Sequence, residues 1–173
     1  MKKKSKAKAK PAPKKSKKVA PIPAGYHAVT PYLAIRGAAQ ALEFYKMAFG
    51  AKETMRMPGP DGRLGHAEIT IGGSRIMLAD EHPEMSILSP QARGGTTVSI
   101  YLYVGNSDAT VERAVQAGAK VLRPVADQFY GDRTGTIEDP FGHMWHIGTH
   151  KEDLSKAELR KRAEKAMAAG SGG

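Results

Sequence analysis

The sequence contains no cysteine and no long apolar run, and each absence excludes a class of protein. Without cysteine there is no disulfide framework, thiolate metal site, iron–sulfur cluster or cysteine nucleophile. No stretch approaches the roughly 18 consecutive apolar residues of a membrane-spanning helix. The N-terminus lacks the apolar core of a secretory signal, and its opening residues lack the arginines of a mitochondrial presequence. We therefore expect a cytoplasmic protein that does not associate with a membrane.

The net charge of +10 is unevenly distributed over the 173 residues. Residues 1–20 hold ten of the 27 lysines and arginines and no acid, so 17 basic and 17 acidic residues remain. Lys, Ala, Pro and Ser bury too little apolar surface to offset chain entropy, so we expect residues 1–22 to be disordered. The lysines within residues 2–18 predict either nonspecific binding to nucleic acid or another polyanion, or a solubilising tail without a partner.

Two similar halves follow this tail. Leu33–Ile35 leads into a helical run from Ala38 to Phe49 that ends at Gly50. Leu102–Val104 leads into a second helical run, from Ser107 to Ala117, which ends at Gly118. Both glycines suit the left-handed conformation that ends many helices. The spacing indicates an internal repeat of one structural unit.

Each helical run is followed by three strand-like segments separated by turn residues. These segments are Thr54–Met57, His66–Ile71 and Arg75–Ala79 in the first half, and Val121–Pro124, Thr134–Glu138 and Met144–Gly148 in the second. The repeat predicts an α+β domain of two tandem strand–helix–strand–strand–strand modules, whose curved mixed sheets surround a cavity. We expect a domain at 23–154, with module one at about 26–80, a connector at 81–95 and module two at about 96–150. Capping-box spacing then predicts a C-terminal helix at 155–169 and a flexible end at 170–173.

Alternation along the strands gives each predicted sheet one aliphatic face and one polar or aromatic face. The opening strand, which we expect to run from Val29 to Arg36, shows this pattern. Two polar faces turned toward each other would line a small-molecule cavity. The candidate ligand-binding residues are Thr30, Tyr32, Ser99, Tyr101, Tyr103, Asp132 and Arg133. The tyrosines either bind a ligand or fill space between the sheets, and the Asp–Arg pair either holds an anionic or amide ligand or only fixes its loop.

Several motifs occur in a recognisable order. They are Glu43–Phe44–Tyr45, Tyr130–Gly131–Asp132–Arg133, the run from Glu138 to His143, and Thr149–His150–Lys151–Glu152–Asp153. Over about residues 26–156 the chain resembles the vicinal-oxygen-chelate superfamily, and the second-half motifs are similar to its PhnB-like branch. That superfamily includes glyoxalase I, extradiol dioxygenases and bleomycin- and fosfomycin-resistance proteins. The resemblance implies a homodimer and a small-molecule ligand.

The resemblance also implies a divalent metal that polarises oxygens of the substrate. At the corresponding positions this sequence has Thr30, Met77, Ser99 and His146, of which only the histidine ligates a first-row metal well. Lyase, isomerase or dioxygenase chemistry of this family would therefore need a displaced metal site.

One such site would combine three residues. His66 and Glu68 lie two apart on one strand face, and His146 would approach from the other module to bind Zn, Mn or Fe. The alternative is that His66 and Glu68 are ordinary polar residues on a wet face. The sequence thus leaves open an enzyme of this family and a non-catalytic protein that sequesters a drug or metabolite.

Overall fold

The computed structural model describes residues 19–170. The predicted polyanion-binding segment 2–18 lies outside the described residues, as do most of the expected tail and residues 171–173 of the expected flexible end. Within the described range, no helix combines the length and the apolar character needed to cross a lipid bilayer.

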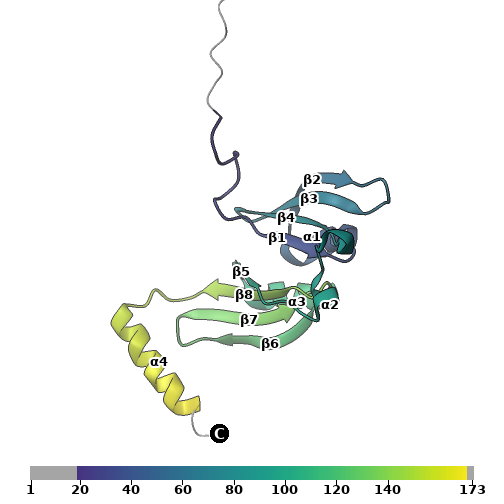
Figure 1. Cartoon of the computed structure of the whole chain (residues 1–173). Helices are drawn as coiled ribbons and strands as arrows, with labels where there is room; N and C mark the ends of the chain where they lie inside the picture. The colour runs from purple at the N-terminus through teal and green to yellow at the C-terminus, as the bar shows by residue number, and fades with distance from the viewer. Residues whose placement is uncertain (1–18, 171–173) are drawn as a thin grey trace, which may run out of the picture.

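Two four-stranded sheets with the same topology confirm the predicted repeat (Figure 1). Module one contains β1 (Tyr32–Ile35), α1 (Ala38–Phe49), β2 (Lys52–Pro58), β3 (Leu64–Ile71) and β4 (Ser74–Asp80). Module two contains β5 (Ser99–Tyr103), α3 (Ser107–Gln116), β6 (Lys120–Asp127), β7 (Asp132–Glu138) and β8 (Met144–His150). Sheet one has the order β1-β4-β3-β2 and sheet two the order β5-β8-β7-β6; the first pair in each is parallel and the others are antiparallel.

The opening strand is shorter than the alternation predicts, since β1 begins at Tyr32 rather than at Val29. Pro31 lacks an N–H group, so it can only accept a ladder hydrogen bond, which it does from the backbone N–H of Met77 at 2.9 Å. Thr30 therefore lies before the sheet, where its hydroxyl donates to the backbone oxygen of His27 at 3.2 Å.

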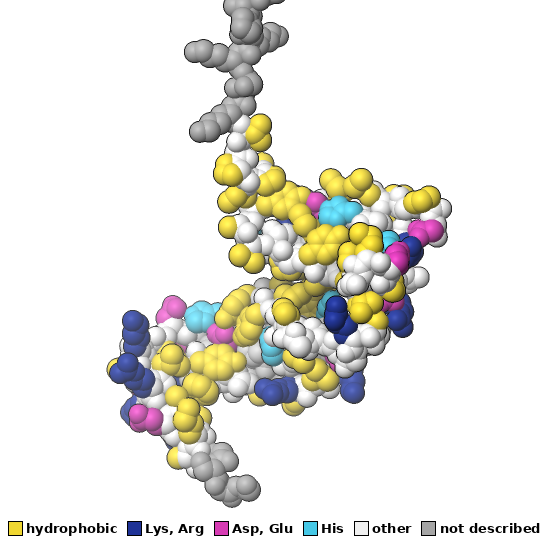
Figure 2. Space-filling model, in the orientation of Figure 1, with side chains coloured by type: hydrophobic (Ala, Val, Ile, Leu, Met, Phe, Trp, Pro, Cys, Tyr) yellow, Lys and Arg dark blue, Asp and Glu magenta, His cyan; other side chains and the backbone are white. Residues whose placement is uncertain are grey.

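The connector and the C-terminus contain the remaining elements. The connector, expected at 81–95, includes the short 3₁₀ helix η1 (Pro83–Met85) and the short helix α2 (Pro90–Arg93). The C-terminal helix α4 (Lys156–Gly170) stands away from both sheets, and Figure 2 shows basic side chains gathered near it. The hydroxyl of Ser155 accepts from the backbone N–H of Glu158 at 3.2 Å, as its capping position predicts.

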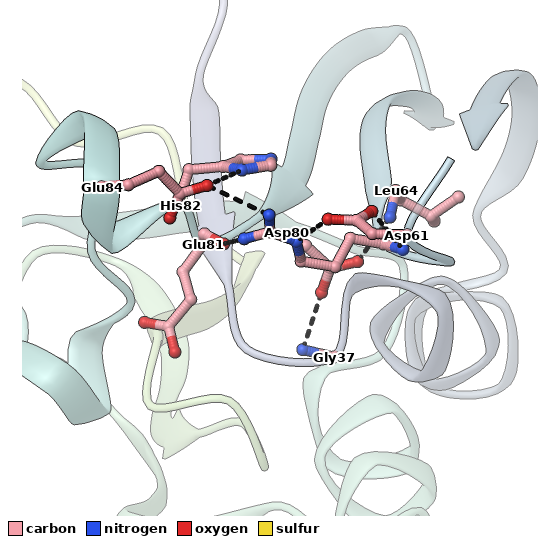
Figure 3. Close-up of polar contacts among 8 residues, drawn as sticks. Gly37, Asp61, Leu64, Asp80, Glu81, His82 and Glu84 are labelled. Carbon is pink, nitrogen blue, oxygen red and sulfur yellow. Dashed lines mark hydrogen bonds and ion pairs between the residues drawn. The ribbon is translucent and has the colours of Figure 1, made fainter. Parts of the chain in front are cut away.

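Asp80, at the end of β4, holds module one together at the point where α1 begins (Figure 3). Gly37, which precedes the helix with a φ of 89°, offers no side-chain cap. The Asp80 carboxylate accepts instead from the backbone N–H groups of Gly37 and Ala38, at 3.0 and 2.8 Å, and from that of Leu64 at 2.6 Å. One carboxylate thus satisfies the helix start and also fixes the first residue of β3.

One apolar core joins the two modules. Helix α1 packs on sheet one, α3 packs on sheet two, and the two helices contact each other. Phe49 of α1 reaches Trp145 of β8, with ring centroids 4.7 Å apart. The buried carboxylate of Asp139 accepts from the Tyr45 hydroxyl at 2.8 Å and from the indole N–H of Trp145 at 2.9 Å. The polar faces lie on the opposite sides of their sheets from this core.

Candidate functional site

The polar face of sheet two carries a connected group of side chains around Tyr101. We call this surface the Tyr101 face; its members are Ser99, Tyr101, Tyr103, Asp132, Thr134, Thr136 and His146. They come from neighbouring strands β5, β8 and β7, and strand alternation turns them toward the same side. Sequence alternation predicted Ser99 and the two tyrosines as one set, and the structure brings Asp132 and His146 to them.

Asp132 is the centre of this face. Its buried carboxylate accepts from the hydroxyls of Tyr103 and Tyr101, at 2.9 and 3.2 Å, and lies 2.8 Å from Nδ1 of His150. Burial alone would raise the pKa of Asp132, but hydrogen bonds from His150 and the tyrosines outweigh it and lower the pKa. Asp132 is therefore a fixed anion that orients both phenol groups.

The partners of Asp132 have pKa values shifted in the direction that its charge requires. The hydrogen bond that His150 donates to Asp132, with a further one to Asp153, raises the pKa of His150. Burial raises the pKa of Tyr101, and the hydrogen bond to Asp132 raises that of Tyr103. Both phenols stay neutral at physiological pH, so they can donate to Asp132 and accept from another group.

His146 occupies the other end of the Tyr101 face. Its Nδ1 lies 3.0 Å from the hydroxyl of Thr136, and its Nε2 lies 3.1 Å from the hydroxyl of Ser99. Its ring stacks on Tyr101 with centroids 5.9 Å apart and planes at 29°. Contacts on both nitrogens and on the ring fix the orientation of His146.

Tyr101 lines three separate pockets. One, of about 270 Å³, lies over the strands and includes Thr134, Thr136 and His146. Two others, of about 340 and 520 Å³, lie where the modules meet. Arg75 and Ile76 of sheet one line the 340 Å³ pocket, and Phe49 of α1 lines the larger one. Tyr101 is 40% exposed, so part of this residue is accessible to a ligand.

Sequence reasoning missed Arg123, Gln128 and Tyr130, which line the 270 Å³ pocket. The irregular pairing of β6 with β7 on both sides of Arg123 places that arginine at the pocket. Pro124, which cannot donate to a ladder, was the one sequence signal of this irregularity. The predicted second-half strand at 121–124 is accordingly part of a longer and bulged strand.

The polar face of sheet one is organised differently. Glu68 is buried, and its carboxylate accepts from the Tyr26 hydroxyl and from the Arg75 guanidinium, both at 2.5 Å. Nε2 of His66 lies 3.2 Å from the same carboxylate. The Arg75 guanidinium also lies over the Tyr26 ring, 4.3 Å from its centroid. The segment before β1 is thus anchored to sheet one by Tyr26, which no sequence pattern indicated.

The residues present do not fit the metal site that the family resemblance implies. The charge of Glu68 is already neutralised by Arg75, and His146 belongs to the other sheet with hydroxyl partners on both nitrogens. The predicted triad of His66, Glu68 and His146 is not assembled, because residues 19–170 contain no group of three His, Asp or Glu side chains placed to hold a metal ion. Thr30 and Met77 add no better ligand.

Two other predicted ligand-binding residues lie away from the Tyr101 face. Arg133 follows Asp132 on β7 but pairs with Asp108 at 2.7 Å and with Asp127 at 3.1 Å, so it ties β7 to neighbouring elements. The guanidinium of Arg133 is thus paired with two carboxylates of its own chain. Tyr32 is exposed on sheet one, with its ring 5.8 Å from that of His66.

Comparison with known families identifies one match. The model of the Glyoxalase/Bleomycin resistance protein/Dioxygenase superfamily matches residues 26–147, which span both modules. An uncharacterized protein of Mycobacterium bovis is 43% identical over 136 residues, which cover 77% of this chain and 90% of that protein.

Two solved structures have a similar fold. One is a gene product of Arabidopsis thaliana, with 26% identity, a TM-score of 0.58, and coverage of 70% of this chain and 98% of that one. The other is a PhnB protein of Bacillus cereus, described as a putative 3-demethylubiquinone-9 3-methyltransferase, with 18% identity and a TM-score of 0.54. It covers 71% of this chain and 99% of its own, and at this identity it shows the fold alone.

Proposed function

Because the chain belongs to the Glyoxalase/Bleomycin resistance protein/Dioxygenase superfamily, we propose that it binds a small aromatic molecule at the Tyr101 face without a metal ion. The position of Tyr101, which lines three pockets at once, is the observation that carries this proposal. A ligand stacked on its ring would extend toward either the strands of sheet two or the junction between the modules.

The side chains of the face supply the interactions that such a ligand needs. The Tyr101 and Tyr103 rings lie 4.7 Å apart and offer apolar surface for stacking. Their hydroxyl protons are directed at Asp132, so a lone pair of each phenol oxygen is left to accept from a ligand phenol or amide. Arg123 at the rim adds a donor for a ligand oxygen. Sequestration fits this arrangement better than metal-dependent isomerase or dioxygenase chemistry, since residues 19–170 place no three His, Asp or Glu side chains together to hold a metal ion.

Calorimetric titration with 2-naphthol and with bleomycin, each with and without EDTA, tests the proposal. We expect binding of at least one compound, unchanged by EDTA, and weakened about 2- to 12-fold in Tyr101→Ala, as expected for the loss of one aromatic pair. Met47→Ala is the matched control, because Met47 is also an exposed large hydrophobic side chain but lies on α1 and lines none of the pockets around Tyr101. Absence of binding by both compounds, or equal weakening in both variants, would contradict the proposal.

We propose in addition that two copies associate as a homodimer. Large apolar side chains are exposed on the edge strands β2 and β6 and in the loop after β6, namely Met55, Met57, Val121, Leu122 and Phe129. A second copy would remove this apolar surface from water. Native mass spectrometry should find twice the chain mass of 18.6 kDa, and a monomer at micromolar concentration would contradict this part of the proposal.

A second candidate function is nonspecific association with a polyanion. The lysines of 2–18 and the basic side chains of α4 support it, the latter being Lys156, Arg160, Lys161, Arg162 and Lys165. If about six lysines contact phosphates, affinity for duplex DNA should fall by about three orders of magnitude between 50 and 200 mM salt. Deleting residues 2–18 should abolish most of the binding, and undiminished binding would refute this function.

A further inference from the structure

A separate pocket of about 510 Å³ lies where β1, the connector and the turn between β7 and β8 meet. It shares no lining residue with the three pockets around Tyr101. Tyr32 and Ala34 contribute one wall from β1, and His143 of the turn contributes another. The third wall comes from the connector and the two residues after it, namely Leu88, Pro90, Ala92, Arg93, Gly95, Thr96 and Thr97. The pocket is therefore assembled from both modules and the segment between them.

The connector wall is held in place by a series of specific contacts. The Glu81 carboxylate, shown in Figure 3, accepts from Arg36 at 2.6 Å and from the backbone N–H of Ser89 at 3.0 Å. The Ser89 hydroxyl in turn caps α2 by accepting from the backbone N–H of Ala92 at 3.3 Å. The side-chain amide of Gln91 donates to the backbone oxygen of Pro140 at 3.4 Å.

Close packing completes this attachment. Gly142, in the turn between β7 and β8, approaches α2 so closely that an added Cβ would lie 2.9 Å from the Cβ of Pro90. Its φ of 83° also favours glycine. The walls are thus fixed before any ligand arrives, which lowers the cost of binding.

Three polar side chains in this pocket have unused hydrogen-bonding capacity. His143 is only 8% exposed, and its Nε2 is buried without a hydrogen-bond partner. Burial lowers the pKa of His143, so its imidazole is neutral at physiological pH. Within residues 19–170, Arg93 makes no ion pair or side-chain hydrogen bond, and the hydroxyl of Thr97 has no partner. Arg93 and Thr97 line the same pocket, and a guanidinium without a carboxylate partner is a typical group for binding a carboxylate.

The rest of the lining is apolar. Ala34, Leu88 and Pro90 and the ring of Tyr32 provide a surface for a hydrocarbon or aromatic group. Pockets that combine such a surface with a few polar groups at one end orient amphipathic small molecules.

We propose that this pocket binds a small organic carboxylate, whose charged group pairs with Arg93 and whose apolar body packs on Leu88 and Pro90. Thr97 donates a second hydrogen bond to the carboxylate, and the ligand lies beside the imidazole of His143, which lines the same pocket. The site is distinct from the Tyr101 face in residues and in ligand charge, and it does not depend on the function proposed for that face.

NMR titration of the full chain with sodium benzoate tests this site. We expect saturable shifts of the His143 imidazole signals, with acetate binding at least tenfold more weakly because it lacks the apolar body. Arg93→Gln should weaken benzoate binding about tenfold or more, as expected for loss of a charge-assisted hydrogen bond. Arg160→Gln, an arginine on α4 that lines none of these pockets, is the matched control and should leave the affinity unchanged.

The outcomes separate this site from the Tyr101 face. Tyr101→Ala should bind benzoate as the unaltered chain does, even where it loses 2-naphthol. The proposal is overturned by the absence of saturable His143 shifts up to about 10 mM benzoate, well beyond millimolar affinity. Equal affinities for acetate and benzoate, or equal effects of the Arg93 and Arg160 substitutions, would also overturn it.

Discussion

Replacing Tyr45 by Phe should destabilise the whole chain, because its hydroxyl is the link between α1 and the buried carboxylate of Asp139. The hydroxyl lies 2.8 Å from Oδ2, and the side chains of Tyr45 and Trp145 are fully buried. Removal leaves the carboxylate with the Trp145 indole and two backbone N–H groups, those of Phe141 and His143. The carboxylate therefore keeps three of four donors, and the loss is one hydrogen bond to a charged acceptor.

Such a bond contributes about 1.5–3 kcal/mol to the free energy of unfolding. In a chain of this length that corresponds to a fall of about 3–12 °C in the melting temperature. Urea denaturation followed by fluorescence measures the change directly, because the protein has a single tryptophan and it lies inside the cluster.

Two comparisons make this prediction specific. Tyr32→Phe removes a hydroxyl from an exposed tyrosine and should change the free energy of unfolding by less than about 0.5 kcal/mol. In Asp139→Asn the acceptor charge is lost, so adding Tyr45→Phe should cost much less than it does alone. A change below about 0.5 kcal/mol in Tyr45→Phe, or full additivity with Asp139→Asn, would refute the assigned role of the Tyr45 hydroxyl.

Three further predictions concern the ligand-binding face and the connector. In Gly148→Ala the new Cβ would lie 2.5 Å from the Tyr101 hydroxyl, so the Tyr101 ring must move. Calorimetry should therefore show weaker binding of 2-naphthol, while circular dichroism should show little loss of the fold. In Asp132→Asn an NMR titration should show a lower pKa for His150, because the anion that stabilises the imidazolium is gone; an unchanged pKa would contradict the cluster. The hydrogen bonds from Arg36 and Ser89 lower the pKa of Glu81 from 4.5 to about 2. The contribution of ionised Glu81 to the free energy of unfolding is therefore complete above pH 4.5 and is lost as the pH falls toward 2. The urea midpoint of the unaltered chain should therefore fall over this range, and the fall should be smaller in Glu81→Gln.

The helices and the repeat could be predicted closely from the sequence because their signals are local. Helix α1 spans Ala38–Phe49 as the glycine that follows it indicated, and φ at Gly50 is 66°. Strand ends were less exact where the backbone departs from a regular ladder. β1 begins late because of Pro31, and β6 continues past its expected end through irregular pairing.

The candidate site was predictable within a sheet but not between sheets. Alternation placed Tyr101 and Tyr103 on one face, since their separation of two residues is a property of one strand. It gave no information on whether His146 approaches Glu68, because that depends on how the two modules pack. Tyr26 was missed for a related reason: it lies in an irregular segment whose contact with Glu68 spans 42 residues of sequence.

The C-terminal helix offers a practical handle on the rest of the molecule. The shared core includes no residue of α4, and Arg162 of this helix pairs with Glu152 at 2.8 Å and with Glu158 of its own first turn at 3.0 Å. A fluorophore or spin label attached along α4 would therefore report on neighbouring molecules while leaving the Tyr101 face and the connector pocket unaltered. Because the native chain has no cysteine, a single cysteine introduced there would be labelled without competition.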